Sequence, residues 1–367
     1  MNLLILTMDY PRLDGTHERM FVHVRNLYYA KNGFNVTVLN FSCKTDYVID
    51  GIEVISLNTY EKEFGHKKES FDIAISHASN IRNHYKFLKK HEKEFDKIVF
   101  FFHGHEVLYL NKEYPKPYFY VKTNRIRSGI FQDFYDAFKI KIWKKYYKKL
   151  AYKSYFVFVS NWIKNKFQYN TGLSDEDLLN HSYIINNSIG EAFERNSYDY
   201  KARKYYDFIT IRSNLDGSKY GVDLVVELAK RYKDRKFLII GAGCFFDYIK
   251  KPNNVFWINH SMDHKEMFKY INASKCGLLL TREDTQGVMT CEFAAYGIPV
   301  ITSDIDVCHE FFSCMPNVEM INNDLNYVDI VSISNRLWEN IPYKKDETYF
   351  AKNTISQEIK LFNSIYE

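Results

Sequence analysis

A carboxylate within an apolar segment is the first feature of this sequence that indicates chemistry. Residues 287–296 predict a helix that is apolar almost throughout, through Val288, Met289, Cys291, Phe293, Ala294 and Ala295. Glu292 lies in its second turn, and no Lys or Arg stands within a helical turn of it. Because a buried carboxylate is costly unless donors bond to it, the vicinal hydroxyls of a bound ribose would be suitable partners. The free N–H groups at the helix start can in turn receive a phosphate.

The residues around this helix have the spacing of a known motif. Asp284 precedes Gly287 and Glu292, while Gly297 and Pro299 follow the helix and lead into a new strand. This pattern resembles the E-x7-E segment of the family-4 retaining glycosyltransferases, which have the GT-B fold. The sequence carries Asp where the first Glu of that motif is usual.

The resemblance implies a role for each of these residues. Glu292 would contact the ribose of a nucleotide-diphosphate sugar, and Asp284 would contact hydroxyls of the sugar. The backbone amides of Gly287, Val288 and Met289 would bind the diphosphate. From Gly287 to Glu292 a helix rises about 7–8 Å, which is comparable to the span from a diphosphate to its ribose.

Two cations precede the predicted helix of residues 221–232. Arg212 ends a predicted strand, and Lys219 stands just before the helix. In the resembled family an Arg and a Lys at this turn clamp the donor diphosphate, so that two positive charges offset the charge developing on the leaving nucleotide. The alternative is a pair of surface cations on a solvated loop.

A Gly-x-Gly pair, Gly241 and Gly243, follows the predicted strand of residues 236–242. Glycines at this place let the backbone approach a ligand closely, so both are candidate donor-binding residues. The same pair can also serve only as a tight turn.

The first half of the chain carries two candidate segments. Asp9–Arg19 resembles the first loop of the family, with Gly15 where a glycine pair is usual. His103 follows a predicted buried strand, and the resemblance implies that it points toward the reacting sugar. His77 and His105 are rival candidates, and a histidine that only satisfies the strand end is the alternative.

No metal site is expected from the sequence. His103 and His105 are spaced as a pair of ligands, but no third ligand can be named. Asp304 and Asp306 form a D-x-D string in the loop after a strand. The resemblance implies a metal-independent reaction without a cofactor, in which a UDP- or GDP-sugar serves as the donor.

Short apolar runs alternate with helical stretches along the whole chain, which predicts parallel sheets covered on both faces. The predicted strands are residues 3–8, 35–40, 52–57, 72–76, 98–102, 156–160, 208–213, 236–242, 255–259, 276–281 and 299–302. The fold class is therefore α/β, with two Rossmann-like domains. The resemblance implies that these domains form the GT-B fold, with an interdomain cleft and a C-terminal helix that crosses back. The expected domains are an acceptor-side domain at residues 1–190, a nucleotide-sugar-binding domain at 191–345 and the returning helix at 346–367.

Composition limits the class of protein. The 367 residues suit two domains, and a hydrophobic fraction of 46% supplies core material. A net charge of +5 does not indicate a nucleic-acid partner. The six cysteines lack metal-type spacing, the start lacks a basic leader, and no run approaches the ~18–20 apolar residues that span a bilayer. We therefore expect a cytoplasmic protein.

The stretch Lys139–Lys153 contains seven lysines and no acid. Apolar residues recur in it at helical spacing, at Ile140, Trp143, Tyr147, Leu150 and Ala151. Such a helix can lie on an anionic membrane surface, which predicts a peripheral location on the inner face of the plasma membrane. An ordinary solvated lysine face over a core stripe explains the pattern equally well.

Taken together, the resemblance implies a retaining hexosyltransferase acting on a glycan or lipid-linked acceptor in bacterial surface polysaccharide or glycoconjugate synthesis. Two other classes remain open. A GT-B epimerase acting on a sugar nucleotide would share the fold and would turn over its donor without an acceptor. A non-catalytic membrane- or nucleic-acid-binding protein would explain the lysines but not the buried Glu292.

Overall fold

The computed structural model describes residues 1–13, 19–65, 67, 70–121 and 129–366. Contacts divide the chain into two compact units. Unit 1 comprises Met1–Leu110, Asp133–Ser188 and Ala351–Glu367, and unit 2 comprises Asn111–Gln132 and Ile189–Phe350. The described residues 111–121 and 129–132 thus lie in the first half of the sequence but belong to unit 2.

Unit 1 is built on a sheet that has eight strands within the described residues, in the order β3-β4-β2-β1-β5-β6-β7-β8. All neighbours are parallel except the edge pair β3 and β4. The central strands are continuous apolar runs with no exposure on either face, as a sheet covered on both sides requires. The strands are β1 (Asn2–Thr7), β2 (Asn35–Asn40), β3 (Tyr47–Ile49), β4 (Ile52–Ile55), β5 (Ile73–His77), β6 (Lys97–Phe102), β7 (Ser154–Phe158) and β8 (Ser182–Ile184).

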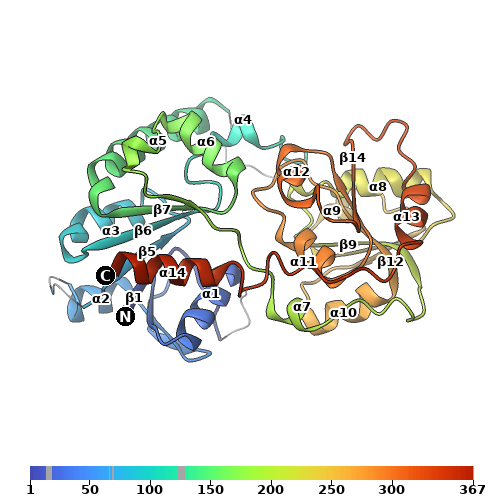
Figure 1. Cartoon of the computed structure of the whole chain (residues 1–367). Coiled ribbons are helices and arrows are strands. Elements are labelled where there is room, and N and C mark those ends of the chain that lie inside the picture. The colour runs from blue at the N-terminus through green and yellow to red at the C-terminus, as the bar shows by residue number, and fades with distance from the viewer. Residues whose placement is uncertain (14–18, 66, 68–69, 122–128, 367) are drawn as a thin grey trace. The chain divides into compact units, whose positions relative to one another are not determined.

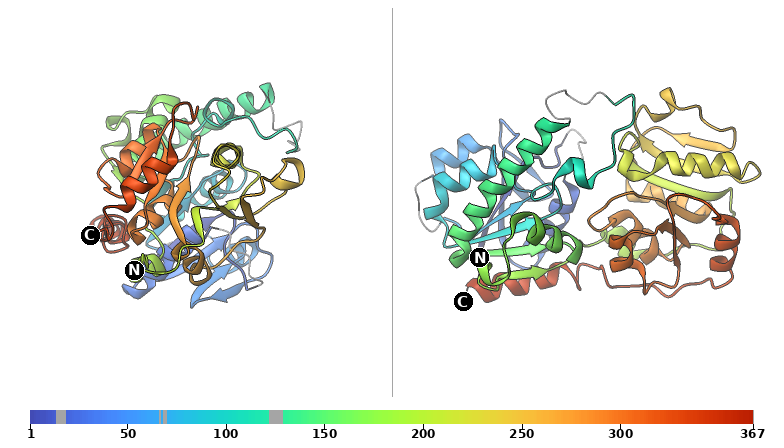
Figure 2. Two further views of the ribbon diagram at one scale, coloured as in Figure 1. Left: turned by 90° about the vertical axis from the view of Figure 1, so that its right-hand side faces the viewer. Right: turned by 90° about the horizontal axis from the view of Figure 1, so that it is seen from above.

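Helices cover both faces of this sheet. One face carries α3, α5 and α6, and the other carries α1 and α14 (Figure 1). The view from above in Figure 2 shows the long green helix α5 lying over its face of the sheet. The helices that lie wholly or mainly in unit 1 are α1 (Met20–Lys31), α2 (Leu57–Glu63), α3 (His84–His91), α5 (Ile130–Leu150), α6 (Asn161–Thr171) and the C-terminal α14 (Ile355–Tyr366), while the short α4 (Leu110–Glu113) lies mainly in unit 2.

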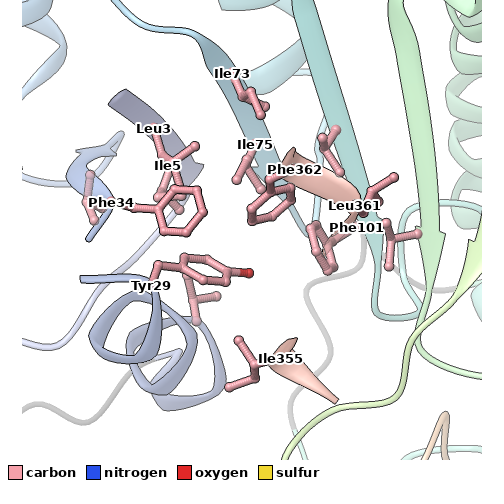
Figure 3. Close-up of a cluster of buried hydrophobic side chains, with 14 of the residues drawn as sticks. Leu3, Ile5, Tyr29, Phe34, Ile73, Ile75, Phe101, Ile355, Leu361 and Phe362 are labelled. Carbon is pink, nitrogen blue, oxygen red and sulfur yellow. The ribbon is translucent and has the colours of Figure 1, made fainter. Parts of the chain in front are cut away.

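The C-terminal helix α14 returns to the first sheet, as the sequence predicts. Figure 3 shows Phe362 packed with Tyr29 of α1 in the core of unit 1. At the same contact, the buried carboxylate of Glu358 accepts a hydrogen bond from Arg25 Nε at 2.9 Å and another from the hydroxyl of Tyr29. Arg25 also donates to the side chain of Asn187 at 2.9 Å. A buried charge pair with these extra hydrogen bonds ties the last helix to unit 1.

Unit 2 contains a fully parallel sheet, in which the described residues form six strands in the order β11-β10-β9-β12-β13-β14. Numbered from β9, this is the doubly wound order 3-2-1-4-5-6, and the direction of winding reverses between β9 and β12. The strands are β9 (Tyr206–Asn214), β10 (Phe237–Ala242), β11 (Val255–Ile258), β12 (Ser274–Leu279), β13 (Val300–Ser303) and β14 (Val318–Ile321).

The helices of unit 2 also form two layers. Apolar side chains of α8 and α13 form one core cluster with the sheet. The helices α7, α10 and α11 lie near one another (Figure 1), and the rings of Phe193, Phe268 and Tyr296 pack between them. The bounds are α7 (Glu191–Arg195), α8 (Val222–Arg231), α9 (Phe245–Tyr248), α10 (His264–Asn272), α11 (Val288–Tyr296), α12 (Asp306–Phe312) and α13 (Ile330–Trp338).

The predicted α/β class with two parallel-sheet domains is confirmed. Every strand predicted from the sequence is present, with ends shifted by a few residues. The short strands β3, β8 and β14 were not predicted. Each has only three or four residues and is mostly half-buried, so none shows the continuous apolar run on which the prediction depended.

Candidate functional site

The candidate site lies at the carboxyl ends of β9 and β12, where the winding of the unit 2 sheet reverses. These two strands are hydrogen-bonded neighbours. Arg212 lies near the end of β9, and Asp284 follows the end of β12. In open α/β sheets, ligands bind outside the carboxyl ends of the strands at this point. Side chains from both predicted motifs therefore meet at the position where such a sheet binds ligands.

The two helices that start here begin without a side-chain cap. Gly221 precedes α8 and Gly287 precedes α11, each in the left-handed region with φ of 60° and 72°. By contrast, Asp263 caps α10 by accepting a hydrogen bond from the N–H of Glu266. The N–H groups of Val288 and Met289 make no hydrogen bond within the described residues. They remain available to an anion.

Arg212 supplies a buried positive charge to the site. Its Nη2 donates to the backbone oxygen of Leu280 at 2.9 Å, and its Nε is buried without a hydrogen-bond partner in the described part of the chain. Burial lowers the pKa of this guanidinium, while the nearby Asp284 acts in the opposite direction. A buried donor that lacks a partner is costly, and an anionic ligand at this position would satisfy it.

Lys219 lies in the short turn Ser218–Tyr220 that precedes α8. Its backbone oxygen accepts hydrogen bonds from the N–H of Arg282 at 2.7 Å and from the hydroxyl of Thr281 at 3.0 Å. These bonds attach the turn to the segment after β12. The Lys219 ammonium is half-buried and forms no ion pair within the described residues. It lies 4.8 Å from the ring centre of Tyr220, which Arg212 also faces at 5.5 Å.

Asp284 occupies the turn before α11. Its Oδ1 accepts a hydrogen bond from the N–H of Thr285 at 2.8 Å. The carboxylate is half-buried, and the α11 cap residue Gly287 lies close to its Oδ2. It therefore contributes a negative group beside the uncapped helix start and the Arg212 guanidinium.

Glu292 is 5% exposed and lies in the second turn of α11. Its Oε1 accepts a hydrogen bond from the N–H of Gly190 at 3.0 Å and lies 3.9 Å from His264 Nε2. Its Oε2 makes no hydrogen bond within the described residues. Burial raises the pKa of this carboxyl to about 7, although the Gly190 N–H acts in the opposite direction. One oxygen is thus used inside the protein and the other can accept from a ligand.

The two glycines at the end of β10, Gly241 within the strand and Gly243 just after it, face protein groups. A side chain at Gly241 would come within 2.2 Å of the Arg212 backbone oxygen, so the glycine permits the close approach of β10 to β9. Gly243 donates its N–H to the side chain of Asn259 at 3.1 Å, and the next N–H is taken by Asp216. These contacts account for both glycines within unit 2.

In unit 1, His103 follows β6 and belongs to a compact polar group. Its Nε2 lies 3.1 Å from Nδ1 of the buried His77, and its ring packs on Phe21. Glu106 accepts hydrogen bonds from the backbone N–H groups of His103 and Gly104, at 2.8 and 2.7 Å. Burial, with the neighbouring His77, lowers the pKa of His103 well below its usual range, so its imidazole is neutral. The predicted Gly15 lies outside the described residues.

Metal-ligating groups are not clustered in the described part of the chain. The Asp304 carboxylate pairs with the imidazole of His309 at 2.5 Å, and Asp306 begins α12. The D-x-D string thus provides one ion pair and one helix start.

Helix α5 contains the lysine-rich stretch. Its predicted core stripe is confirmed, because Ile140, Trp143, Tyr147 and Leu150 are all buried. The first and last lysines of the stretch, Lys139 and Lys153, are buried and do not lie on the exposed lysine face that the sequence predicts. Lys139 is buried and donates to Asp136 and to two backbone oxygens, and Lys153 donates to the backbone oxygens of Glu92 and Phe95.

The exposed side of α5 carries a row with helical spacing. Its first half presents three phenylalanines that are 58–70% exposed, Phe131, Phe134 and Phe138. The row continues with the exposed Lys141, Lys145 and Lys148. Among the described residues, no helix is long and apolar enough to cross a bilayer.

No family model matches the sequence, and no curated protein matches it. Solved structures do match it. Sucrose-phosphate synthase from Thermosynechococcus elongatus superimposes with a TM-score of 0.70 at 10% identity, covering 100% of this chain and 99% of that one. The glycosyltransferase WaaG, involved in lipopolysaccharide biosynthesis, gives 0.57 at 14% identity over 92% and 90%. The chain has the GT-B fold. An alpha-glucosyltransferase, solved with UDP-glucose and DNA containing an abasic site, gives 0.61 at 12% identity over 99% of both chains.

The GT-B chain also holds site residues that sequence reasoning did not select. Gly190 and His264 contact Glu292. The ring of Tyr220 faces both Arg212 and Lys219. Gly190 is the last residue of the first expected domain, and a single glycine at that place offers little signal in the sequence. Tyr220 is adjacent to Lys219, so an aromatic ring beside a candidate phosphate-binding cation was the available clue.

Proposed function

We propose that this protein is a retaining, metal-independent glycosyltransferase that moves a sugar from a nucleotide-diphosphate sugar to a glycan or lipid-linked acceptor. The observation that carries the proposal is the position of Glu292 one and a half turns into α11, behind an uncapped helix start. A nucleoside diphosphate matches this arrangement. Its ribose hydroxyls donate to the free carboxylate oxygen, and its phosphates accept from the Val288 and Met289 N–H groups.

The charged groups of the site account for how it would promote transfer of the sugar. Transfer leaves negative charge on the nucleoside diphosphate, and Arg212 and Lys219 supply the compensating positive charge. Preorganised charges in a partly desolvated site are the largest electrostatic contribution available to such a reaction. The unpartnered Arg212 Nε supports this role, because a phosphate oxygen would satisfy it. Asp284 would bind a hydroxyl of the sugar and so orient it for transfer.

Retention and metal independence rest on the resemblance of Asp284–Pro299 to the E-x7-E segment. In the proposed reaction, the anomeric carbon exchanges its bond to the diphosphate for a bond to the acceptor oxygen on the same face. The acceptor proton passes to the departing phosphate. Unit 1 would bind the acceptor, and the neutral imidazole of His103 would hydrogen-bond to it.

The row on α5 supports a membrane-borne acceptor. The opposite side of the helix packs in the core, so the exposed Phe131, Phe134 and Phe138 take no part in core packing. Aromatic side chains beside lysines suit the interface of an anionic bilayer. We therefore propose that α5 docks on the cytoplasmic leaflet, as a pathway for bacterial surface polysaccharide or glycoconjugates would require. The alpha-glucosyltransferase structure contains DNA. For this chain we propose no nucleic-acid partner, because a net charge of +5 does not indicate one.

A panel of UDP-, GDP- and ADP-sugars tests the proposal by thermal stabilisation of the full chain. A ligand at 100 times its Kd adds about 2.7 kcal/mol, a shift that is readily measured. The stabilising donor is then incubated with short glycan acceptors, and the anomeric configuration of the product is read by NMR. We expect retention. Stabilisation by no nucleotide sugar, or an inverted product, contradicts the proposal, and donor conversion without acceptor identifies an epimerase.

A further inference from the structure

A segment from the first half of the sequence lies on the loop that carries Lys219. We define the strap as Tyr114–Tyr120, which packs within unit 2. The hydroxyl of Tyr118 donates to Asp223 at 2.7 Å, and the hydroxyl of Tyr120 donates to Asp216 at 2.9 Å. The Tyr120 ring stacks on Tyr248 at 4.5 Å between centres. Strap and loop are therefore joined by hydrogen bonds and by ring packing.

The strap also contacts the Lys219 ammonium. Nζ lies 5.3 Å from the ring centre of Tyr114 and 4.8 Å from that of Tyr220. Two aromatic faces thus hold the ammonium group. An aromatic face attracts a cation without neutralising its charge, whereas a carboxylate partner would neutralise it. This is the environment that an anion-binding lysine needs.

The acids closest to Lys219 in the sequence are occupied elsewhere. Asp216 accepts from Tyr120 and from the N–H of Cys244. Asp223 accepts from Tyr118 and forms two hydrogen bonds with Arg282, at 2.8 and 2.6 Å. Burial favours the neutral acid, but the bonds from Arg282 and Tyr118 outweigh it and lower the pKa of Asp223. Both carboxylates are therefore engaged by groups other than the Lys219 ammonium.

We infer that the strap is a positioning element for the diphosphate of the donor: Tyr114 orients the Lys219 ammonium, while Tyr118 and Tyr120 keep the flanking carboxylates from pairing with it. This inference rests on the proposed function, because it assigns Lys219 to a phosphate ligand. It predicts that the strap affects affinity for the diphosphate group and not for the nucleoside.

A double-mutant cycle on the full chain tests the inference. UDP, GDP and ADP are titrated by calorimetry, and the tightest is used with its monophosphate. We expect Tyr114→Leu to weaken diphosphate binding about three- to tenfold, in line with a partly desolvated cation–π contact. Tyr114→Phe, which keeps the ring, should restore the affinity. In the Lys219→Ala background, Tyr114→Leu should have no further effect, and monophosphate affinity should not change.

Tyr200→Leu is the matched control, because Tyr200 is an exposed tyrosine that faces a lysine, Lys201, at 5.8 Å. Thermal unfolding of each variant separates a folding defect from a binding defect. If Lys219→Ala weakens diphosphate binding but Tyr114→Leu does not, the strap has no positioning role while the proposed function stands. An equal loss from Tyr114→Leu with and without Lys219 also overturns the inference. If the wild-type chain binds none of the three diphosphates, the proposed function fails and the inference fails with it.

Discussion

The carboxylate of Glu292 accepts a hydrogen bond from the backbone N–H of Gly190 at 3.0 Å, across 102 positions of the sequence. A side chain at Gly190 would come within 2.4 Å of the His264 ring, so glycine is needed for the chain to pass this point. The bond occupies one carboxylate oxygen and fixes the orientation of the other. A buried acid is thereby held in place with one acceptor free for a ligand.

Replacing Glu292 with Gln should weaken nucleotide binding about tenfold or more. The amide retains an acceptor oxygen, but it loses the charge, and a hydrogen bond to a charged group contributes roughly 1.5–3 kcal/mol. Calorimetric titration with the nucleoside diphosphate measures the effect. Glu266→Gln, at an exposed position of α10, is the control. Unchanged affinity in Glu292→Gln would remove Glu292 from the site.

The same substitution should stabilise the free protein at high pH. The pKa of Glu292 is raised by burial to about 7 in the folded state, whereas a Glu in an unfolded chain has a pKa of about 4.3. Between these values the folded state binds more protons, so the free energy of unfolding falls as pH rises through this window. The wild-type protein should therefore lose about 2–3 kcal/mol relative to Glu292→Gln between pH 5 and pH 8.

Urea denaturation of both proteins at pH 5 and pH 8 gives this difference directly. Other titrating groups cancel, because they are common to the two proteins. An equal stability difference between the two proteins at pH 5 and at pH 8 would contradict the raised pKa of Glu292.

Lys219→Ala and Arg212→Ala should each lower turnover about 10²–10³-fold, because each removes a positive charge from the leaving diphosphate. Release of nucleoside diphosphate from the donor is the measurement. Lys230→Ala is the control, since Lys230 is exposed on α8 and pairs with Glu227 at 3.6 Å. Wild-type turnover in either site variant, with an intact fold by circular dichroism, would support the alternative of a solvated loop.

Chelation should leave the reaction rate unchanged. The site supplies positive charge through Arg212, Lys219 and the α11 start, and the Asp304 carboxylate is paired with His309. The rate is compared before and after dialysis against EDTA. Loss of activity that magnesium restores would show that a metal ion takes part and would return attention to Asp304 and Asp306.

Binding to anionic vesicles should depend on both halves of the α5 row. Replacing Phe134 and Phe138 with Ser removes apolar contact area, and replacing Lys141 and Lys145 with Gln removes about 1 kcal/mol for each charge. Only the lysine variant should change the salt dependence, because the Debye length falls to about 3 Å at 1 M salt.

Sedimentation with phosphatidylglycerol vesicles measures this binding. Tyr327→Ser, at a fully exposed position of unit 2, is the control. Activity on a short soluble acceptor should survive all of these changes. If the wild-type protein does not sediment with the vesicles at low salt, the row is a solvated face and membrane docking is excluded.

The alternation of strands and helices was readable from the sequence, because a buried strand or an amphipathic helix carries its pattern within a few residues. The run Leu3–Leu6 is one example of the strand pattern, and the predicted helix of residues 221–232 is one of the helix pattern. The spacing of Asp284, Gly287 and Glu292 is also local, since one turn and one helix separate them. The sequence therefore sufficed to propose the α11 site.

Contacts between distant segments were decided only by the tertiary structure. Lys139 and Lys145 look alike in the sequence, yet Lys139 is buried against Asp136 and Lys145 is exposed. Tyr114 lies 105 positions before Lys219, and no local pattern relates them. Gly190 likewise gains its role only when α7 packs beside α11. Local periodicity reports which face of an element is buried, but not which distant group meets it, because that depends on how the elements pack.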